Sequence, residues 1–135
     1  MPRLTANPNA EASASFDVVR PGTYLLRVET ISEFIAKSGS TCWKLRASYA
    51  NTNECVDMAG VQCKNPGALF DNGLVIIPAE KQGKTRSFVE ACGKEWTDLD
   101  SDELIGLEFQ AKVGVRKDKN GENQNEISRY LARVA

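Results

Sequence analysis

The most regular pattern in the chain is an alternation of apolar and polar positions across residues 107–116. A period of two sends successive side chains to opposite faces, so the pattern predicts a β-strand with one buried face. The turn sequence Asp118-Lys119-Asn120-Gly121 follows, and residues 125–131 are predicted to return as a second strand. The apolar members of the first strand are Leu107, Phe109, Ala111, Val113 and Val115.

The returning strand alternates less well, because Arg129 stands between Ile127 and Leu131. A β-bulge, or a sheet edge at which Arg129 reaches solvent, would explain the break. The polar face and the tip of this hairpin are cationic, which is the first indication of a function. The cations are Lys112, Arg116, Lys117, Lys119 and Arg129.

Two more strands are predicted in the first half of the chain. Tyr24, Leu26 and Val28 share one face of the first strand, and a change of phase near Thr30 predicts a bend or bulge. A turn at 37–40 precedes the second strand, at 41–50. Its apolar face, expected in the core, holds Trp43, Leu45, Ala47 and Tyr49, and its other face holds Cys42, Lys44, Arg46 and Ser48.

The middle of the chain gives weaker patterns. Val56, Met58 and Val61 indicate a short third strand, with turns at 65–67 and 71–73 and a brief apolar strand at 74–77. Residues 85–92 have helical periodicity, and Gly93 is placed to end that helix. Residues 101–106 are predicted to form one more helical turn, with Asp100 or Ser101 as its N-cap.

Length and charge limit the possibilities further. A chain of 135 residues suits one domain, which we assign to residues 16–135, preceded by a flexible tail at 1–15. The net charge of −1 excludes the global cationic field of a histone-like protein, so any polyanion site has to be a local patch. Residues 95–103 instead hold five acids and no cation. The sequence has neither an apolar run long enough to span a bilayer nor a signal-peptide pattern at its N-terminus. A cytoplasmic protein is therefore expected.

The motifs of catalysis and metal binding are missing from the sequence. The segment Gly83-Lys84-Thr85 lacks the earlier glycine of a phosphate-binding loop, because Pro78 stands there and offers no N–H, so Lys84 and Arg86 are expected to be solvated. No histidine is present for a nucleophilic triad. The four cysteines lack zinc-site spacing and are expected as buried thiols. We therefore predict a binding protein, not an enzyme, with no catalytic residue, metal or cofactor.

The predicted order is strand-strand-strand-helix-strand-strand, which is the order of the five-stranded oligonucleotide-binding (OB) barrel. The expected fold is thus all-β with one or two short helices. That fold binds single strands on its second and third strands and at its last hairpin. For Lys44 and Arg46, a solvated role and a binding role remain equally open. The candidate rings for base stacking are Phe34 and Tyr130, together with Trp43 if its side chain faces outward and not into the core. The full set of candidate nucleic-acid-binding residues is Arg27, Phe34, Lys37, Lys44, Arg46, Lys112, Arg116, Lys117, Lys119, Arg129 and Tyr130.

Several short segments together resemble a family. They are Pro21-Gly22-Thr23-Tyr24, Lys37-Ser38-Gly39, Phe88-Val89-Glu90-Ala91-Cys92-Gly93, Leu104-Ile105-Gly106-Leu107, Asn120-Gly121 and Asn125-Glu126-Ile127. The sequence resembles the phage-encoded single-stranded-DNA-binding or recombination-accessory proteins of phage replication modules. The resemblance implies an OB-type barrel, binding of single-stranded DNA without strong sequence preference, and work in the host cytoplasm. The last residues, from Arg129 onward, are not the acidic tail with which many such proteins recruit partners.

Two functions are therefore expected from the sequence. The first is sequence-nonspecific binding of single-stranded DNA in phage DNA replication or recombination, with replication or recombination proteins as further partners and a homodimer as a possible assembly. The alternative is a protein-interaction or structural accessory module of a phage that binds no nucleic acid, which the near-neutral charge and the acidic segment favour. No membrane partner is expected in either case.

Overall fold

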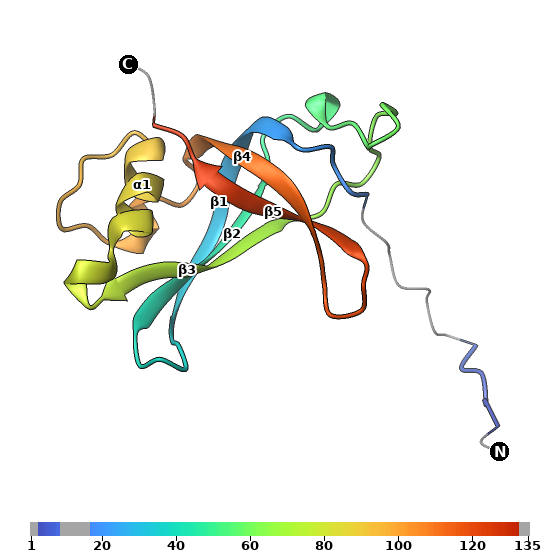
Figure 1. The fold of residues 1–135 in the computed structure, drawn as a ribbon, viewed down its shortest axis with the longest axis horizontal. Helices are drawn as coiled ribbons and strands as arrows, with labels where there is room; N and C mark the ends of the chain where they lie inside the picture. The colour runs from blue at the N-terminus through green and yellow to red at the C-terminus, as the bar shows by residue number, and fades with distance from the viewer. Residues whose placement is uncertain (1–2, 9–16, 133–135) are drawn as a thin grey trace.

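A computed structural model describes residues 3–8 and 17–132 of the protein, so most of the predicted tail lies outside the described residues. Five antiparallel strands form one sheet in the order β3-β2-β1-β4-β5, and one α-helix follows β3 (Figure 1). The prediction of a mostly β domain with one helix is confirmed. The bounds are β1 Gly22–Ile35, β2 Thr41–Tyr49, β3 Leu69–Ile77, α1 Gly83–Ala91, β4 Glu108–Lys117 and β5 Asn123–Tyr130, with short 3-10 turns at Thr52–Glu54, Ala79–Lys81 and Ser101–Glu103.

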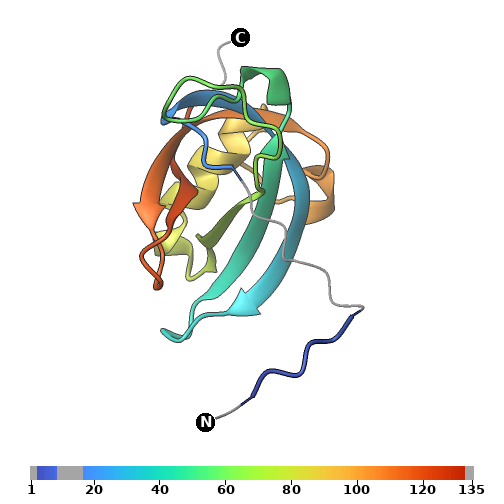
Figure 2. The same ribbon diagram turned by 90° about the vertical axis from the view of Figure 1, so that its right-hand side faces the viewer.

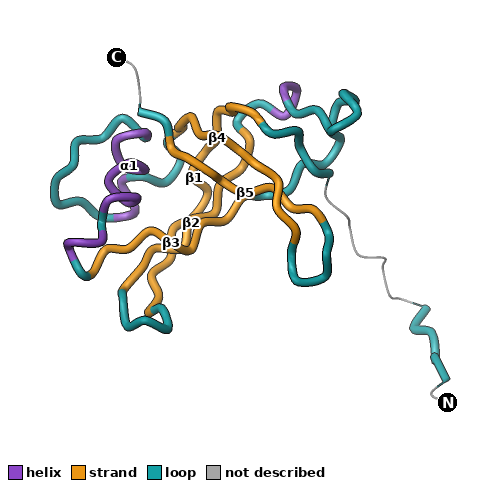
Figure 3. The backbone as a smooth tube through the Cα atoms, in the orientation of Figure 1, coloured by secondary structure: helices purple, strands orange, loops and turns teal. Residues whose placement is uncertain are grey.

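The long first strand belongs to both halves of the sheet. Residues 22–27 pair with β4, and residues 26–35 pair with β2. Leu26 and Arg27 therefore pair with both neighbours. The register of the β1–β2 pair shifts between Val28 and Thr30, which confirms the predicted bulge. The strands occupy the middle of the molecule (Figure 3), and β1 and β2 curve along their length (Figure 2). A bent strand of this kind lets a sheet curl around its own core.

The two edge strands are joined by side chains on the inner face of the curl. The Tyr130 hydroxyl of β5 donates a 2.6 Å hydrogen bond to the Asp71 carboxylate of β3. The Lys84 ammonium of α1 lies 2.9 Å from the same oxygen, Asp71 Oδ2, and donates to Asp71 Oδ1 at 3.0 Å. Asp71 is buried, so its charge is compensated inside the protein by a hydroxyl and an ammonium. Lys84, predicted to be solvated, therefore has a structural partner.

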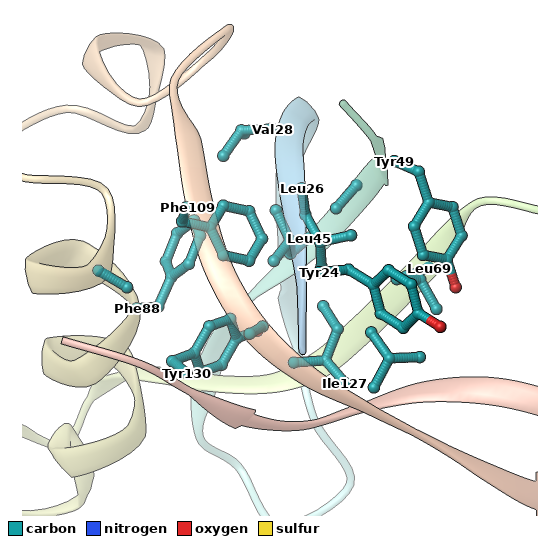
Figure 4. Close-up of a cluster of buried hydrophobic side chains, with 14 of the residues drawn as sticks. Tyr24, Leu26, Val28, Leu45, Tyr49, Leu69, Phe88, Phe109, Ile127 and Tyr130 are labelled. Atoms are coloured by element: carbon teal, nitrogen blue, oxygen red, sulfur yellow. The ribbon is translucent and has the colours of Figure 1, made fainter. Parts of the chain in front are cut away.

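The core lies inside the curled sheet, and α1 packs against one end of it (Figure 4). Phe88 of α1 meets Phe109 of β4 edge to face, with ring centroids 5.5 Å apart. The centroid of the Tyr130 ring lies 5.3 Å from that of Phe88 and 5.7 Å from that of Phe109. Tyr24 and Tyr49 form a second edge-to-face pair, 5.5 Å apart. Aromatic pairs in this geometry add to the burial of their apolar area, so the rings hold helix and sheet together.

The position of Tyr130 corrects one prediction. The β4–β5 register passes from Lys112↔Arg129 to Val113↔Ile127, so Ser128 of β5 has no cross-strand partner in β4. A single extra residue reverses the facing of every side chain beyond it. The bulge predicted near Arg129 is therefore present, and it turns Tyr130 into the core, where only 6% of the residue is exposed. Tyr130 was predicted as a base-stacking ring, and that prediction is wrong.

The third strand is the second correction. The sequence indicated a strand near Val56 and a turn at 71–73, but Val56 makes only an isolated bridge and β3 runs straight through 71–73. The register moves from Leu45↔Asp71 to Trp43↔Leu74, so β3 carries one extra residue at this point. The Asp71 carboxylate accepts the Gly73 N–H at 2.8 Å and stabilises the irregular segment. Turn-forming residues are used here inside a strand, as a bulge.

The helix and the cysteines agree with the sequence. The structure has α1 from Gly83 to Ala91 where 85–92 was predicted, and a capping box at Asp100 and Glu103 begins the 3-10 turn that follows. All four cysteines are buried thiols and not disulfides. Cys55 and Cys63 are linked through a backbone hydrogen bond, in which the Cys63 N–H donates to the Cys55 carbonyl at 2.8 Å. They lie within the core cluster that contains Tyr24 and Tyr49.

The buried thiol of Cys55 leads to a prediction about alkaline pH. Burial, with smaller contributions from Cys63 and Glu54, raises the pKa of Cys55 from its usual 9.0 to about 11. The folded protein therefore holds this proton more tightly than the unfolded chain does, so stability is fully present below pH 9.0 and falls as the pH rises toward 11. Urea titrations should show this decline, and it should be shallower in Cys55→Ala. An identical pH dependence in the variant would contradict the assignment.

Candidate nucleic-acid interface

An aromatic ring and two cations meet on the outer face of β2 and β3. Alternation along β2 turns Leu45 and Ala47 inward, so Lys44 and Arg46 point to solvent. On the neighbouring strand, Phe70 is the cross-strand partner of Arg46 and is 52% exposed. Because Leu69 and Asp71 on either side of Phe70 are buried, the ring is fixed on the outer face. An exposed phenylalanine on the outer face of a sheet is a candidate binding group.

The two cations lie against the ring. Lys44 Nζ is 5.7 Å and the Arg46 guanidinium carbon is 5.9 Å from the centroid of Phe70. Both distances suit cation–π attraction, which orients the side chains without neutralising their charge. The face therefore combines an exposed apolar ring with two positive charges from β2 that lie against it. We name this group of three residues, Lys44, Arg46 and Phe70, the Phe70 platform.

A groove of about 960 Å³ runs from the Phe70 platform to the β4–β5 hairpin. Arg46, Ser48 and Phe70 line one side, and Arg116 with residues 122–126 lines the other. Residues 66–68, which lead into β3, complete the wall. The groove is large enough for several nucleotides or a short peptide. It brings together two of the predicted cations, Arg46 and Arg116.

The electrostatics of the groove are mixed. Four acids also line it, and two of these have local structural partners: Asp17 accepts the backbone N–H groups of Lys64 and Asn65 at 2.9 Å, and Glu29 accepts the Ser48 hydroxyl. Glu126 lies 3.4 Å from Arg116 in an exposed ion pair, which is a weak interaction in water. The fourth acid is Glu122. The strongest local excess of positive charge is therefore on the Phe70 platform and not deep in the groove.

Sequence comparison places the chain in a family. The model of a family described as proteins of unknown function, DUF669, matches residues 6–133. The chain belongs to the DUF669 family. No curated protein matches the chain at a significant level. The structure of this DUF669 chain therefore carries the functional argument.

Two turns of the DUF669 chain carry predicted cations, and both lie at the lower end of the molecule in Figures 1 and 2. The β1–β2 turn presents Lys37 and reverses at Gly39, with φ of +88°. The β4–β5 turn presents Lys117 and Lys119. In the second turn the Asp118 carboxylate accepts backbone N–H groups of Asn120 and Glu122, at 2.8 and 3.0 Å, which holds the lysines on a defined loop.

Other predicted binding residues lie elsewhere on the sheet. Lys112 and Arg129 are cross-strand partners on the outer face of β4 and β5, and neither lines the groove. Arg27 is exposed on β1, opposite Ser48 on one side and Glu108 on the other. The structure therefore divides the predicted set. Lys44, Arg46 and Arg116 belong to the platform or the groove, and Lys117 and Lys119 lie on the β4–β5 turn beside the groove. Lys37 on the β1–β2 turn, Arg27, Lys112 and Arg129 lie outside both.

The predicted stacking rings are less exposed than expected. Phe34 is half-buried on β1, opposite Cys42, and Trp43 is half-buried and packs against the core. Phe70 was not predicted, because residues 71–73 were interpreted as a turn and the strand before them was missed. The alternation of Leu69, Phe70 and Asp71 was the available signal, although an aspartate at an inward position concealed it. No charged or cysteine cluster suited to a metal ion is present within 3–8 and 17–132, and no helix in those ranges is long and apolar enough to cross a bilayer.

Proposed function

We propose that this protein binds single-stranded DNA without sequence specificity and that its sheet is an OB-fold-like barrel. The observation that carries the proposal is the Phe70 platform, an exposed ring with two cations of the neighbouring strand against it. A base stacked on such a ring gains about 1–3 kcal/mol, and every base has a face to stack. The flanking cations would contact phosphates, which carry no sequence information.

The arrangement of the strands supports the barrel. Strand β1 pairs with both β2 and β4, the helix stands between β3 and β4 in sequence, and Tyr130 and Asp71 link β5 to β3. A barrel of this type uses its second and third strands and its last hairpin loop for single strands. The Phe70 platform is on β2 and β3, and the groove extends to the β4–β5 hairpin.

The biological setting is also part of the proposal. The sequence resemblance to phage single-stranded-DNA-binding and recombination-accessory proteins supports a role in phage DNA replication or recombination in the host cytoplasm. Binding, not catalysis, would be the activity. Replication or recombination proteins would then be its protein partners.

The test is fluorescence anisotropy of a labelled single-stranded oligonucleotide at several salt concentrations, with a duplex of equal length for comparison. We expect binding to the single strand only. Contacts to about three to five phosphates would give a slope of log K against log salt of about −2 to −4. Lys44→Glu with Arg46→Glu should weaken binding and reduce that slope.

A matched control makes the site assignment specific. Lys112→Glu with Arg129→Glu changes the net charge equally, but on the outer face of β4 and β5. This variant should keep most of the affinity. Equal losses in the two double variants would contradict the Phe70 platform as the site, and no binding to any single strand at low salt would favour the accessory module that binds protein only.

A further inference from the structure

A second hollow lies beside α1, between the helix and the segment that follows it. Its volume is about 330 Å³, and none of its lining residues lines the groove. Trp43 of β2 and Trp96 of the segment after α1 both contribute, and they are the only tryptophans of the sequence. This segment and α1 are on the left of Figure 1, whereas the β4–β5 hairpin is on the right. The remaining lining residues are Ile76, Gln82, Thr85, Val89, Thr97, Asp98 and Leu99.

The walls of this hollow leave a particular set of groups available. The Gln82 amide donates to the Ile76 carbonyl and the Thr85 hydroxyl to the Val75 carbonyl, each at 2.6 Å, so these polar groups are used to attach α1 to β3. Trp96 is 37% exposed, although indole rings are usually well buried. The groups left for a ligand therefore include the two indole rings, the Thr97 hydroxyl and the carboxylate of Asp98.

Asp98 is the charged residue that lines the hollow. Lys84 and Arg86 of α1, which adjoin the lining residue Thr85, are paired with Asp71 and Glu90, and Lys81 adjoins Gln82. Residues 95–103 hold five acids and no cation. Asp100 and Glu103 serve the capping box, but none of the three salt bridges found among the described residues involves Asp98. A phosphate backbone would be repelled here, whereas a cationic ligand would be attracted. Indole rings bind cations through their faces, and a neighbouring carboxylate adds a charged acceptor.

We propose that this hollow binds a basic peptide segment of a partner protein through an arginine side chain. The planar guanidinium would stack on the indole of Trp96 or Trp43 and donate hydrogen bonds to Asp98, a combination that arginine satisfies better than lysine. The surrounding acids would select a peptide with further cations. This inference goes beyond the proposed DNA binding, because it gives the protein a separate surface for a protein partner.

The test uses the full chain and three short acetylated peptides that differ at two positions: arginine, lysine or citrulline. Citrulline has nearly the shape of arginine without its charge. The two indole N–H signals in a ¹H–¹⁵N spectrum report on Trp43 and Trp96 alone. We expect the arginine peptide to shift both signals in a saturable way, the lysine peptide to bind several-fold more weakly, and the citrulline peptide to have no effect.

Variants make the test specific to the hollow. Trp96→Ala should weaken arginine-peptide binding about tenfold and Asp98→Asn about threefold, as removal of a cation–π contact and of an exposed ion pair would. Both residues are exposed, so both variants should fold. Phe70→Ala should bind the peptide as the original protein does. Equal binding of the citrulline peptide, no shift with any peptide, or an equal loss of single-stranded DNA affinity in Trp96→Ala would each overturn the inference.

Discussion

Asp71→Ala is expected to lower the free energy of unfolding by about 3 kcal/mol, since it removes one partner from a buried charged network. The Asp71 carboxylate accepts the Tyr130 hydroxyl at 2.6 Å and the Gly73 N–H at 2.8 Å, and Lys84 Nζ lies 2.9 Å away. Without it, a buried hydroxyl loses its acceptor. The Lys84 side chain is half exposed, so water can solvate that charge and the loss should not reach the largest values known for buried pairs. Urea unfolding followed by tryptophan fluorescence measures the change.

Two further variants separate the network from ordinary truncation. Tyr130→Phe combined with Asp71→Ala removes both ends of the link between β5 and β3, and the double variant should lose less than the sum of the two single variants. Glu33→Ala, an exposed acid on β1, should change stability by only a few tenths of a kcal/mol. Additive effects of Asp71→Ala and Tyr130→Phe would show that the two side chains do not act together.

Phe70→Ala is expected to weaken single-stranded DNA binding by about 5-fold to 150-fold, which corresponds to the loss of one stacked base. Stability should change little, because Phe70 is 52% exposed and lies outside the core. The anisotropy assay measures the affinity and urea unfolding measures the stability. A large loss of affinity at unchanged stability would identify the ring as a binding group.

Two substitutions distinguish stacking from simple apolar contact. Phe70→Leu keeps an apolar side chain without a π face, so it should behave like Phe70→Ala. Phe70→Trp keeps and enlarges the face, so it should bind at least as tightly as the original protein. If Phe70→Leu bound the oligonucleotide normally, the proposed stacking would be wrong even though the face could still bind DNA through Lys44 and Arg46.

Local periodicity was sufficient to predict the parts of the fold that have one buried face. In β1, β2 and β4 the alternation marks the inward residues directly, and Leu26, Leu45 and Phe109 are all in the core. The bulge near Thr30 was also visible, because it interrupts an otherwise continuous apolar pattern. Of the cations predicted from those strands and loops, Lys44 and Arg46 lie together on one face, as their spacing implied.

The errors share one physical cause, which is a polar or aromatic residue whose partner is distant in sequence. Asp71 faces inward because Tyr130 and Lys84 compensate it, and neither is near it in the chain. Tyr130 faces inward because of a bulge at Ser128. The broken alternation near Arg129 indicated a bulge, but its exact position depends on pairing with β4. The facing of Phe70 follows from that of Asp71. A pattern read along one strand contains no information about such partners.

The shared position of β1 has a consequence for how the protein is made. Leu26 has Phe109 as its partner in β4. The first half of β1 therefore cannot complete its pairing until residues more than eighty positions later have been synthesised. At the usual pace of a ribosome this takes on the order of ten seconds. During that time β1 and β2 can form a hairpin, while the side of β1 that receives β4 remains open. A nascent chain with an uncovered strand edge is the kind of substrate that chaperones bind, so we expect the yield of this protein in a cell to depend on how fast residues 108–113 arrive.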